Sequence, residues 1–172
     1  MPTALVLASG RGERFLTSGG TTHKLQARLG DKTVLQHTMD AVRASGLPWH
    51  LENAGHPGMG DSIAAAVRAT AQANGWLIVL GDLPLIQAST LQTLSSALGL
   101  HDVVIPTYNG QRGHPVGFSP RCREALLGLT GDTGASSVVK LFGAVEIPVD
   151  DVGIVSDIDT LADLERVTRL MR

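Results

Sequence analysis

The chain has 172 residues, of which 43% are hydrophobic and 17% are charged. This composition excludes a disordered chain and predicts a single globular domain over residues 1–172, with a core of aliphatic side chains. The formal net charge of −2 excludes a broad basic surface for nucleic acid or an anionic membrane, so any phosphate must bind at a local site.

In chain order, apolar runs alternate with amphipathic segments. Residues 4–8 predict a buried strand, and the Gly-, Ser- and Arg-rich residues 10–22 predict a loop. The remaining predicted strands are 48–53, 76–80, 102–106, 114–118 and 145–149. The predicted helices run from Thr33 to Gly46, from Asp61 or Ser62 to Ala73, from Ser89 or Thr90 to Gly99, after Ser119-Pro120, over 134–142, and from Thr160 onward. Gly46 suits the C′ position of the first, Asp61 or Ser62 the N-cap of the second, and Thr160 with Asp163 resembles a capping box at the last. This alternation favours βαβ units, so we expect a Rossmann-like three-layer α/β/α domain with a mostly parallel sheet.

The cysteine and histidine content bears on compartment and metal chemistry. Cys122 is the single cysteine, so no disulfide can form within the chain and a reducing compartment is expected. The sequence shows neither a signal peptide nor an apolar run near the roughly 20 residues of a membrane span. We therefore expect a cytoplasmic protein with no membrane partner. The scattered histidines do not have the spacing of a zinc site.

The first candidate site follows the first predicted strand. Gly10 and Gly12 allow backbone N–H groups to approach an anion, while Arg14 and Lys24 can neutralise phosphate oxygens. The alternative is a tight turn with solvated arginines. A dinucleotide fingerprint fails because Phe15 stands where glycine is required, and the chain has no Gly-Lys-Ser/Thr of a P-loop.

The second candidate site is Asp82, which follows the predicted strand 76–80. Ligands of open parallel sheets collect beyond the carboxyl ends of the strands, and Mg²⁺ favours one or two carboxylates together with phosphate oxygens. Asp157 or Asp159, just before the last predicted helix, could supply a second carboxylate. The alternative is that these aspartates cap turns and helices.

The order of these segments resembles the nucleotidyltransferase superfamily with a glycosyltransferase-A-like fold, and within it the molybdenum cofactor cytidylyltransferase and guanylyltransferase family. The opening pattern of that family, Leu-x-x-Gly-x-Ser/Gly-x-Arg-x-Gly-x-x-Lys, is matched here by Leu7, Gly10, Gly12, Arg14 and Lys24. Similar segments then follow in family order: 24–25 with 30–38, Gly58-Met59-Gly60-Asp61-Ser62, Gly81-Asp82-Leu83-Pro84, Gly113-His114-Pro115-Val116-Gly117-Phe118, Gly131-Asp132-Thr133-Gly134-Ala135 and Asp157-Ile158-Asp159-Thr160. Each motif alone is weak, but their order is specific.

This resemblance implies a Mg²⁺-dependent enzyme that transfers a nucleoside monophosphate from CTP or GTP to a small phosphorylated acceptor such as molybdopterin. A molybdoenzyme or maturation protein would be its protein partner. Arg14, Lys24 and Asp82 would be the catalytic residues, with Arg14 and Lys24 on the triphosphate. Asp82, with Asp157 or Asp159, would ligate the metal.

The resemblance also implies the binding residues. Gly113, His114 and Pro115 would line the acceptor pocket. The implied nucleotide-binding residues are Leu7, Ala8, Ser9, Gly10, Arg11, Gly12, Gly58, Met59, Gly60, Ser62 and Gly81.

Three features depart from the family pattern. Residues 18–22 lengthen the loop before Lys24, and Leu16 stands where glycine is expected, which predicts a displaced Lys24 in the absence of ligand. The stretch 46–58 is too short for the usual strand-helix-strand, so one βα element is expected to be missing. Ser9 carries a Cβ where the guanylyl branch has glycine, which favours CTP over GTP.

Two alternatives remain from the sequence. The same fold could act on a sugar phosphate, a polyol phosphate or a phospholactate-like acid. The chain could also be a nucleotide-binding accessory protein that has lost turnover.

Overall fold

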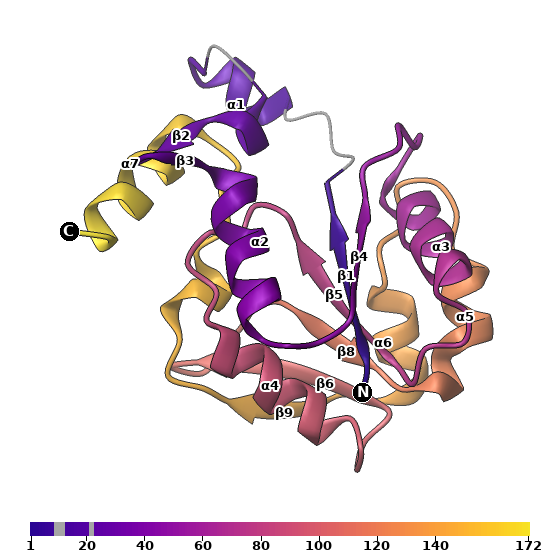
Figure 1. Cartoon of the computed structure of the whole chain (residues 1–172). Helices are drawn as coiled ribbons and strands as arrows, with labels where there is room; N and C mark the ends of the chain where they lie inside the picture. Colours follow the sequence, from indigo (N-terminus) through magenta and orange to yellow (C-terminus); the bar gives the residue numbers. More distant parts are fainter. Residues whose placement is uncertain (9–12, 21–22) are drawn as a thin grey trace.

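The computed structural model describes residues 1–8, 13–20 and 23–172, and of Glu13 and Arg14 the backbone alone. Within these residues a seven-stranded sheet has the order β4-β1-β5-β8-β6-β7, with β9 also paired to β6 (Figure 1). Its strands are β1 (Thr3–Leu7), β4 (Trp49–Glu52), β5 (Trp76–Leu80), β6 (Val103–Tyr108), β7 (Gln111–Arg112), β8 (Val116–Phe118) and β9 (Val145–Pro148).

Most of the sheet is parallel, as the sequence predicts. β1 lies between β4 and β5 and is parallel to both, and β9 is parallel to β6. β8 is antiparallel to its neighbours β5 and β6. Leu7 pairs with both Glu52 and Leu80, so β1, β4 and β5 end at the same level. Their carboxyl ends therefore form one edge, where ligands of such sheets bind.

Helices cover both faces of this sheet and complete a three-layer α/β/α arrangement (Figure 1). The helices of one layer are α2 (Val34–Ala44) and α4 (Ala88–Ala97); those of the other are α3 (Met59–Ala69), α5 (Arg123–Leu127) and α6 (Ser136–Phe142). The remaining elements are α1 (Glu13–Thr17), η1 (Lys24–Gln26), β2 (Arg28–Leu29), β3 (Lys32–Thr33), η2 (Pro120–Cys122), η3 (Val152–Val155) and α7 (Leu161–Leu170). Among the described helices, none has the length and apolar character needed to cross a bilayer.

The sheet has one apolar cluster on each face, because successive side chains of a strand point to opposite faces. Ala4 and Val6 of β1 join the cluster under α2 and α4, whereas Leu5 and Leu7 join the cluster under α3 and α5. A strand buried on both faces must be apolar at every position, which explains its uninterrupted apolar sequence. Burying one such aliphatic side chain contributes about 1.5–3 kcal/mol.

A third apolar cluster lies beyond the carboxyl edge of the sheet. Phe15 and Leu25 from the N-terminal half of the chain pack there with Val34 of α2, and with Ile158 and Val167 from the C-terminal end. The segment around α7 is thereby held beside α1, β2 and β3, close to the C-terminus (Figure 1). This cluster joins residues 15–34 to residues 158–167 next to the sheet edge.

The capping predictions were right at two helices. Thr33 and Gln36 form a capping box at α2, and Gly46 has the positive φ expected just beyond its C-cap. Thr160 and Asp163 form the predicted capping box at α7.

Other predicted helix boundaries were wrong. Part of the expected 10–22 loop is the helix α1. α3 begins at Met59 with Gly58 as its N-cap, because the side chain of Asp61 accepts a hydrogen bond from the Gly131 N–H instead of capping the helix. α4 begins at Ala88, and Thr90 donates its hydroxyl to a distant carboxylate, that of Asp151.

Candidate active site

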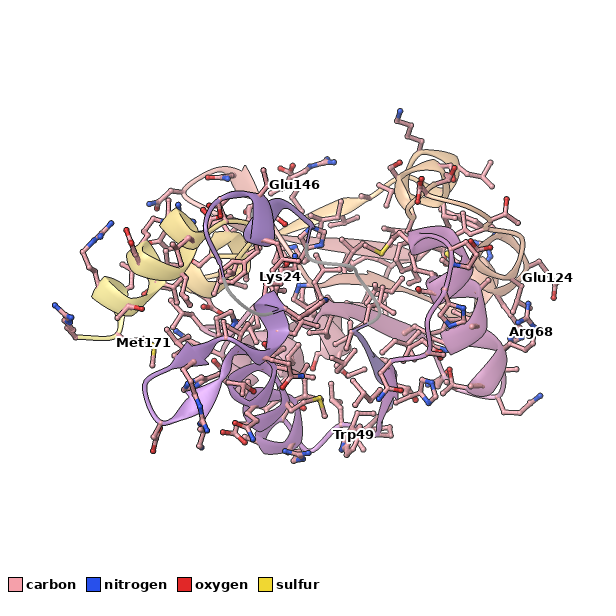
Figure 2. The ribbon with its side chains drawn as sticks, turned by 90° about the horizontal axis from the view of Figure 1, so that it is seen from above. Lys24, Trp49, Arg68, Glu124, Glu146 and Met171 are labelled. Atoms are coloured by element: carbon pink, nitrogen blue, oxygen red, sulfur yellow. The ribbon has the colours of Figure 1, made fainter. Side chains whose placement is uncertain are left out.

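Three carboxylates and one ammonium meet beyond the carboxyl edge of the sheet. Asp82, Asp157 and Asp159 each offer an oxygen atom, and these atoms lie within 4.8 Å of one another. Nζ of Lys24 lies 2.8 Å from Asp82 Oδ2 and 3.1 Å from Asp159 Oδ1. In a view from above, Lys24 lies near the middle of the molecule, whereas Trp49 and Arg68 lie at its margin (Figure 2). We call these four side chains the acidic cluster.

Asp82 is placed by the tight junction of β1 and β5. The Gly81 N–H donates to the Leu7 carbonyl over 2.9 Å, and a Cβ at position 81 would lie 3.0 Å from that oxygen. The Thr38 hydroxyl of α2 donates to the Gly81 carbonyl over 2.8 Å. Glycine therefore lets the chain turn closely past the end of β1, and the turn delivers the next side chain, Asp82, to the edge.

The Asp157–Asp159 segment is fixed by the residue between its two carboxylates. The Ile158 N–H donates to the Asp82 carbonyl over 3.1 Å, and the Ile158 side chain is fully buried in the third apolar cluster. Asp163 accepts a hydrogen bond from the Asp159 N–H over 2.9 Å. With Ile158 anchored in the core, its two neighbours present their carboxylates on the side of Asp82.

Lys24 is positioned by the short turn η1. His23 is the N-cap of this turn, and its Nδ1 accepts a hydrogen bond from the Leu25 N–H over 3.2 Å. Leu25 is buried in the third apolar cluster. The backbone on both sides of Lys24 is therefore anchored, so the lengthened preceding loop does not keep the side chain from Asp82.

Burial and the ion pair between Asp82 and Lys24 act in opposite directions on the pKa of each of these two residues. Burial raises the pKa of Asp82 above its ordinary value, with smaller contributions from the charges of Asp157 and Asp159, and Lys24 only partly offsets these effects. Burial alone would lower the pKa of Lys24, but its charge and hydrogen-bond interactions with Asp82 and Asp159 raise it. Lys24 therefore stays protonated in the presence of these carboxylates.

The side chains of the acidic cluster suit a hard divalent cation. Asp82 is 6% exposed, and its Oδ1 has no hydrogen-bond partner among the described residues. A buried carboxylate oxygen without a partner is costly unless a ligand satisfies it. Three carboxylates against one lysine leave an excess of negative charge among these four side chains. Oxygen ligands of this kind are those that Mg²⁺ and Mn²⁺ prefer.

His114, in the turn before β8, borders the acidic cluster. Burial lowers the pKa of His114 although the charges of Asp157 and Asp82 would raise it. The backbone N–H of His114 donates to the Ile154 carbonyl over 2.9 Å, and a Cβ at Gly113 would lie 2.3 Å from the same oxygen. The predicted acceptor turn, with Pro115 buried behind it, is thus packed on η3 beside the carboxylates.

The remaining predicted site residues are not part of the acidic cluster. Gly58, Met59, Gly60 and Ser62 lie in the first turn of α3. A Cβ at Gly58 or Gly60 would lie within 2.3–2.5 Å of backbone oxygens in the 130–133 loop, so packing alone requires these glycines. Ser9, Gly10, Arg11 and Gly12 lie outside the described residues. Arg14 lies in α1 with its side chain outside the described part, and Leu7 ends the buried strand at the edge, with Ala8 directly after it.

A further polar cluster at this edge was missed by sequence reasoning. The two carboxylate oxygens of Glu52, at the end of β4, lie 2.9 Å from His50 Nε2 and 2.8 Å from His56 Nε2. The hydrogen bonds to His56 and His50 lower the pKa of Glu52, although burial, the largest single effect, would raise it. The spacing of His50 and Glu52 puts both side chains on one face of a strand, which is the signal that could have indicated the pair.

The fold and this site define a family. The chain belongs to the MobA-like NTP transferase domain family, whose model matches residues 4–147. It is 31% identical to the purine catabolism protein PucB of Bacillus subtilis (strain 168) over 119 residues. That match covers 66% of this chain, and the chain spans 58% of the length of PucB.

Two solved structures share the fold. The complex of Rv0371c with manganese from Mycobacterium tuberculosis H37Rv has a TM-score of 0.77 and 23% identity, and 97% of each chain is covered. The molybdopterin-guanine dinucleotide biosynthesis protein A of Archaeoglobus fulgidus has a TM-score of 0.70 and 16% identity, and 98% of each chain is covered. The predicted fold class is thereby confirmed.

Proposed function

We propose that the protein is a Mg²⁺-dependent nucleotidyltransferase, in which the whole chain acts as one domain. It transfers CMP, in preference to GMP, from the nucleoside triphosphate to molybdopterin or the molybdenum cofactor and releases pyrophosphate. The observation that carries this proposal is the convergence of Lys24 with Asp82, Asp157 and Asp159 at the carboxyl edge of a sheet of this family.

Asp82, together with Asp157 or Asp159, would hold the metal. Asp82 Oδ1, which no described residue contacts by a hydrogen bond, and the manganese complex of Rv0371c support a divalent cation at this site. When bound, such a cation would offset the negative charge that develops on the triphosphate during transfer.

The residues of the chain would chiefly position the reactants. Lys24 and Arg14 would bind phosphate oxygens, and the backbone after Ala8 would bind ribose and base. His114, kept neutral by burial, can exchange hydrogen bonds with the acceptor beside the carboxylates. An acceptor phosphate oxygen then attacks the α-phosphorus, the bond from this phosphorus to the bridging oxygen of the β-phosphate breaks, and pyrophosphate leaves. Orientation and charge neutralisation suffice for this step.

The choice of base and acceptor rests on sequence resemblance. Ser9 at the base-binding position favours CTP. The molybdenum cofactor motifs of this chain, and the name of the Archaeoglobus fulgidus protein, support a molybdopterin acceptor and a molybdoenzyme or maturation protein as partner.

The test is a matrix of two nucleotides and several acceptors. The purified protein is mixed with CTP or GTP, MgCl₂, and molybdopterin, a sugar phosphate or a polyol phosphate, and pyrophosphate release and the dinucleotide product are measured. We expect product with molybdopterin and faster turnover with CTP. Turnover with only a sugar or polyol phosphate would assign that compound as the acceptor in place of molybdopterin. Nucleotide binding without pyrophosphate release would indicate an accessory protein.

A further inference from the structure

We propose that Lys24 occupies the acidic cluster in place of the divalent cation until a nucleoside triphosphate draws it away, so that metal and nucleotide bind as a coupled pair. This inference rests on the metal site of the proposed function and adds to it a mechanism that controls the order of loading.

The geometry puts the ammonium where a metal would bind. Nζ of Lys24 bridges Asp82 Oδ2 at 2.8 Å and Asp159 Oδ1 at 3.1 Å, and these two carboxylates belong to the set whose oxygens lie within 4.8 Å of one another. A divalent cation held by these carboxylates would lie close to the ammonium. Like charges at such a separation repel strongly at a poorly solvated site. Lys24 and the metal therefore compete for these carboxylates.

The competition is appreciable because the pair is shielded from water. The side chains of Lys24 and Asp82 are 16% and 9% exposed. Ion pairs on the surface contribute little to stability, whereas a shielded pair that loses one partner leaves an uncompensated buried charge. A free metal ion must therefore displace a cation that the fold already supplies, and we expect it to bind weakly on its own.

A nucleoside triphosphate changes this balance. Its phosphate oxygens offer Lys24 a substitute for the carboxylates, and the four-carbon stem of lysine can swing between them. The backbone of η1 need not move, because His23 and Leu25 hold it on both sides of Lys24. The triphosphate thus removes the competing ammonium and also brings phosphate ligands for the metal. Linkage makes the effect reciprocal, so bound metal favours the nucleotide as well.

The test measures Mn²⁺ binding without nucleotide by isothermal titration calorimetry, in wild type, Lys24→Met and Lys24→Arg. We expect Lys24→Met to bind Mn²⁺ about tenfold more tightly than wild type, because the internal competitor is gone. Lys24→Arg retains the positive charge and should bind Mn²⁺ as weakly as wild type. An affinity in Lys24→Met that is equal to or weaker than that of wild type would overturn the inference.

A second measurement tests the coupling. With a non-hydrolysable CTP analogue present, wild type should bind Mn²⁺ much more tightly than without it, and Lys24→Met should lose most of this enhancement. Thermal unfolding in metal-free buffer is the folding control. Lys24→Met should have a lower Tm than wild type, because its carboxylates repel one another. Added Mn²⁺ should raise the Tm of the variant toward that of wild type. A variant whose metal-free Tm is unchanged would count against the counter-ion role of Lys24.

Asp82→Asn separates this inference from the proposed function. If Asp82→Asn abolishes Mn²⁺ binding in the Lys24→Met background, the metal lies at the acidic cluster. If binding survives, the metal site itself is wrong and the proposed function fails with it. If Asp82 is required but Lys24→Met binds no more tightly than wild type, the metal site stands and only the competition by Lys24 is refuted.

Discussion

Lys24 and Asp82 form an ion pair of 2.8 Å across 58 residues of sequence, and the same ammonium reaches Asp159 across 135. The pair joins a short turn near the N-terminus to the end of a central strand and to the segment before the last helix. These three segments have no local reason to meet. The cluster of Phe15, Leu25 and Ile158 joins the first segment to the third, and the Ile158 N–H donates to the Asp82 carbonyl at the end of the strand, so packing and this hydrogen bond set the distances between the charged groups.

Asp82→Asn should reduce nucleotidyl transfer by about 10²-fold or more, because it removes a charged ligand from the site of developing charge. The fold should be retained, since the amide is nearly isosteric with the carboxylate. Pyrophosphate release and circular dichroism check both statements. Glu146→Gln, at an exposed carboxylate paired with Arg112, is the control and should stay at wild-type activity. Near-normal activity of Asp82→Asn would remove Asp82 from the mechanism.

Gly60→Ala should destabilise the protein by about 1–3 kcal/mol, because its Cβ would lie 2.5 Å from the Thr133 carbonyl oxygen and 2.7 Å from that of Thr130. The measurement is the urea dependence of the free energy of unfolding. Gly55→Ala is the matched control, since a Cβ there meets nothing within 4 Å and should change stability by less than about 0.5 kcal/mol. Equal effects of the two substitutions would show that steric contact at Gly60 is unimportant.

Asp151→Ala should destabilise the fold by about 3 kcal/mol. Asp151 is 1% exposed, and its carboxylate accepts hydrogen bonds from the Gln87 N–H, the Thr90 hydroxyl and the Gly153 N–H. Each donor left buried without a partner costs about 1–3 kcal/mol. Thermal and urea unfolding report the loss, and the exposed neighbour Asp150 gives the control substitution Asp150→Ala. An Asp151→Ala protein as stable as the control would mean that water satisfies all three donors.

Glu52→Gln should change how stability depends on pH. The folded pKa of Glu52 lies below its ordinary value of 4.5, so the stabilisation is complete above that value and is lost as pH falls through the folded pKa. At about pH 6 wild type should therefore exceed Glu52→Gln by about 1–2 kcal/mol, since hydrogen bonds to a charged group are worth about 1.5–3 kcal/mol.

The difference between wild type and Glu52→Gln should shrink toward zero as the pH is lowered below the folded pKa. Urea unfolding across this range measures it. Glu124→Gln, at an exposed glutamate on α5, is the control for the loss of a surface carboxylate (Figure 2). A constant offset for Glu52→Gln would show that Glu52 has the same pKa in the folded and unfolded chains.

Local patterns were enough for six strands of the main sheet and for two helix starts, whereas the two-residue strands β2, β3 and β7 were missed. The strand Trp76–Leu80 and the capping box of Thr160 and Asp163 lie where the sequence predicts them. Both signals act over a few residues, because an apolar strand is specified by its own side chains and a capping box by positions three apart. The helix α1 was missed because residues 10–22 are rich in glycine and polar residues.

Hydrogen bonds between distant segments could not be derived in this way. Asp151 accepts hydrogen bonds from Gln87 and Thr90 at the start of α4, more than 60 residues away. Asp61, predicted as a local N-cap, accepts a hydrogen bond from the Gly131 N–H instead. A local N-cap and a hydrogen bond to a distant N–H would each satisfy a donor and an acceptor, so the sequence does not decide between these two arrangements. The decision follows from which backbone groups the packed layers bring within reach.

Motif order and apolar periodicity are properties of short segments of the chain. They were therefore sufficient to identify the family, the alternation of strands and helices, and Asp82, Asp157 and Asp159 as the candidate carboxylates. The packed fold was needed to show that Lys24 pairs with Asp82 and Asp159 and that Glu52 contacts two histidines. Ion pairing depends on the inverse of the distance between groups and on their burial, and both are set by the packing of segments far apart in the chain.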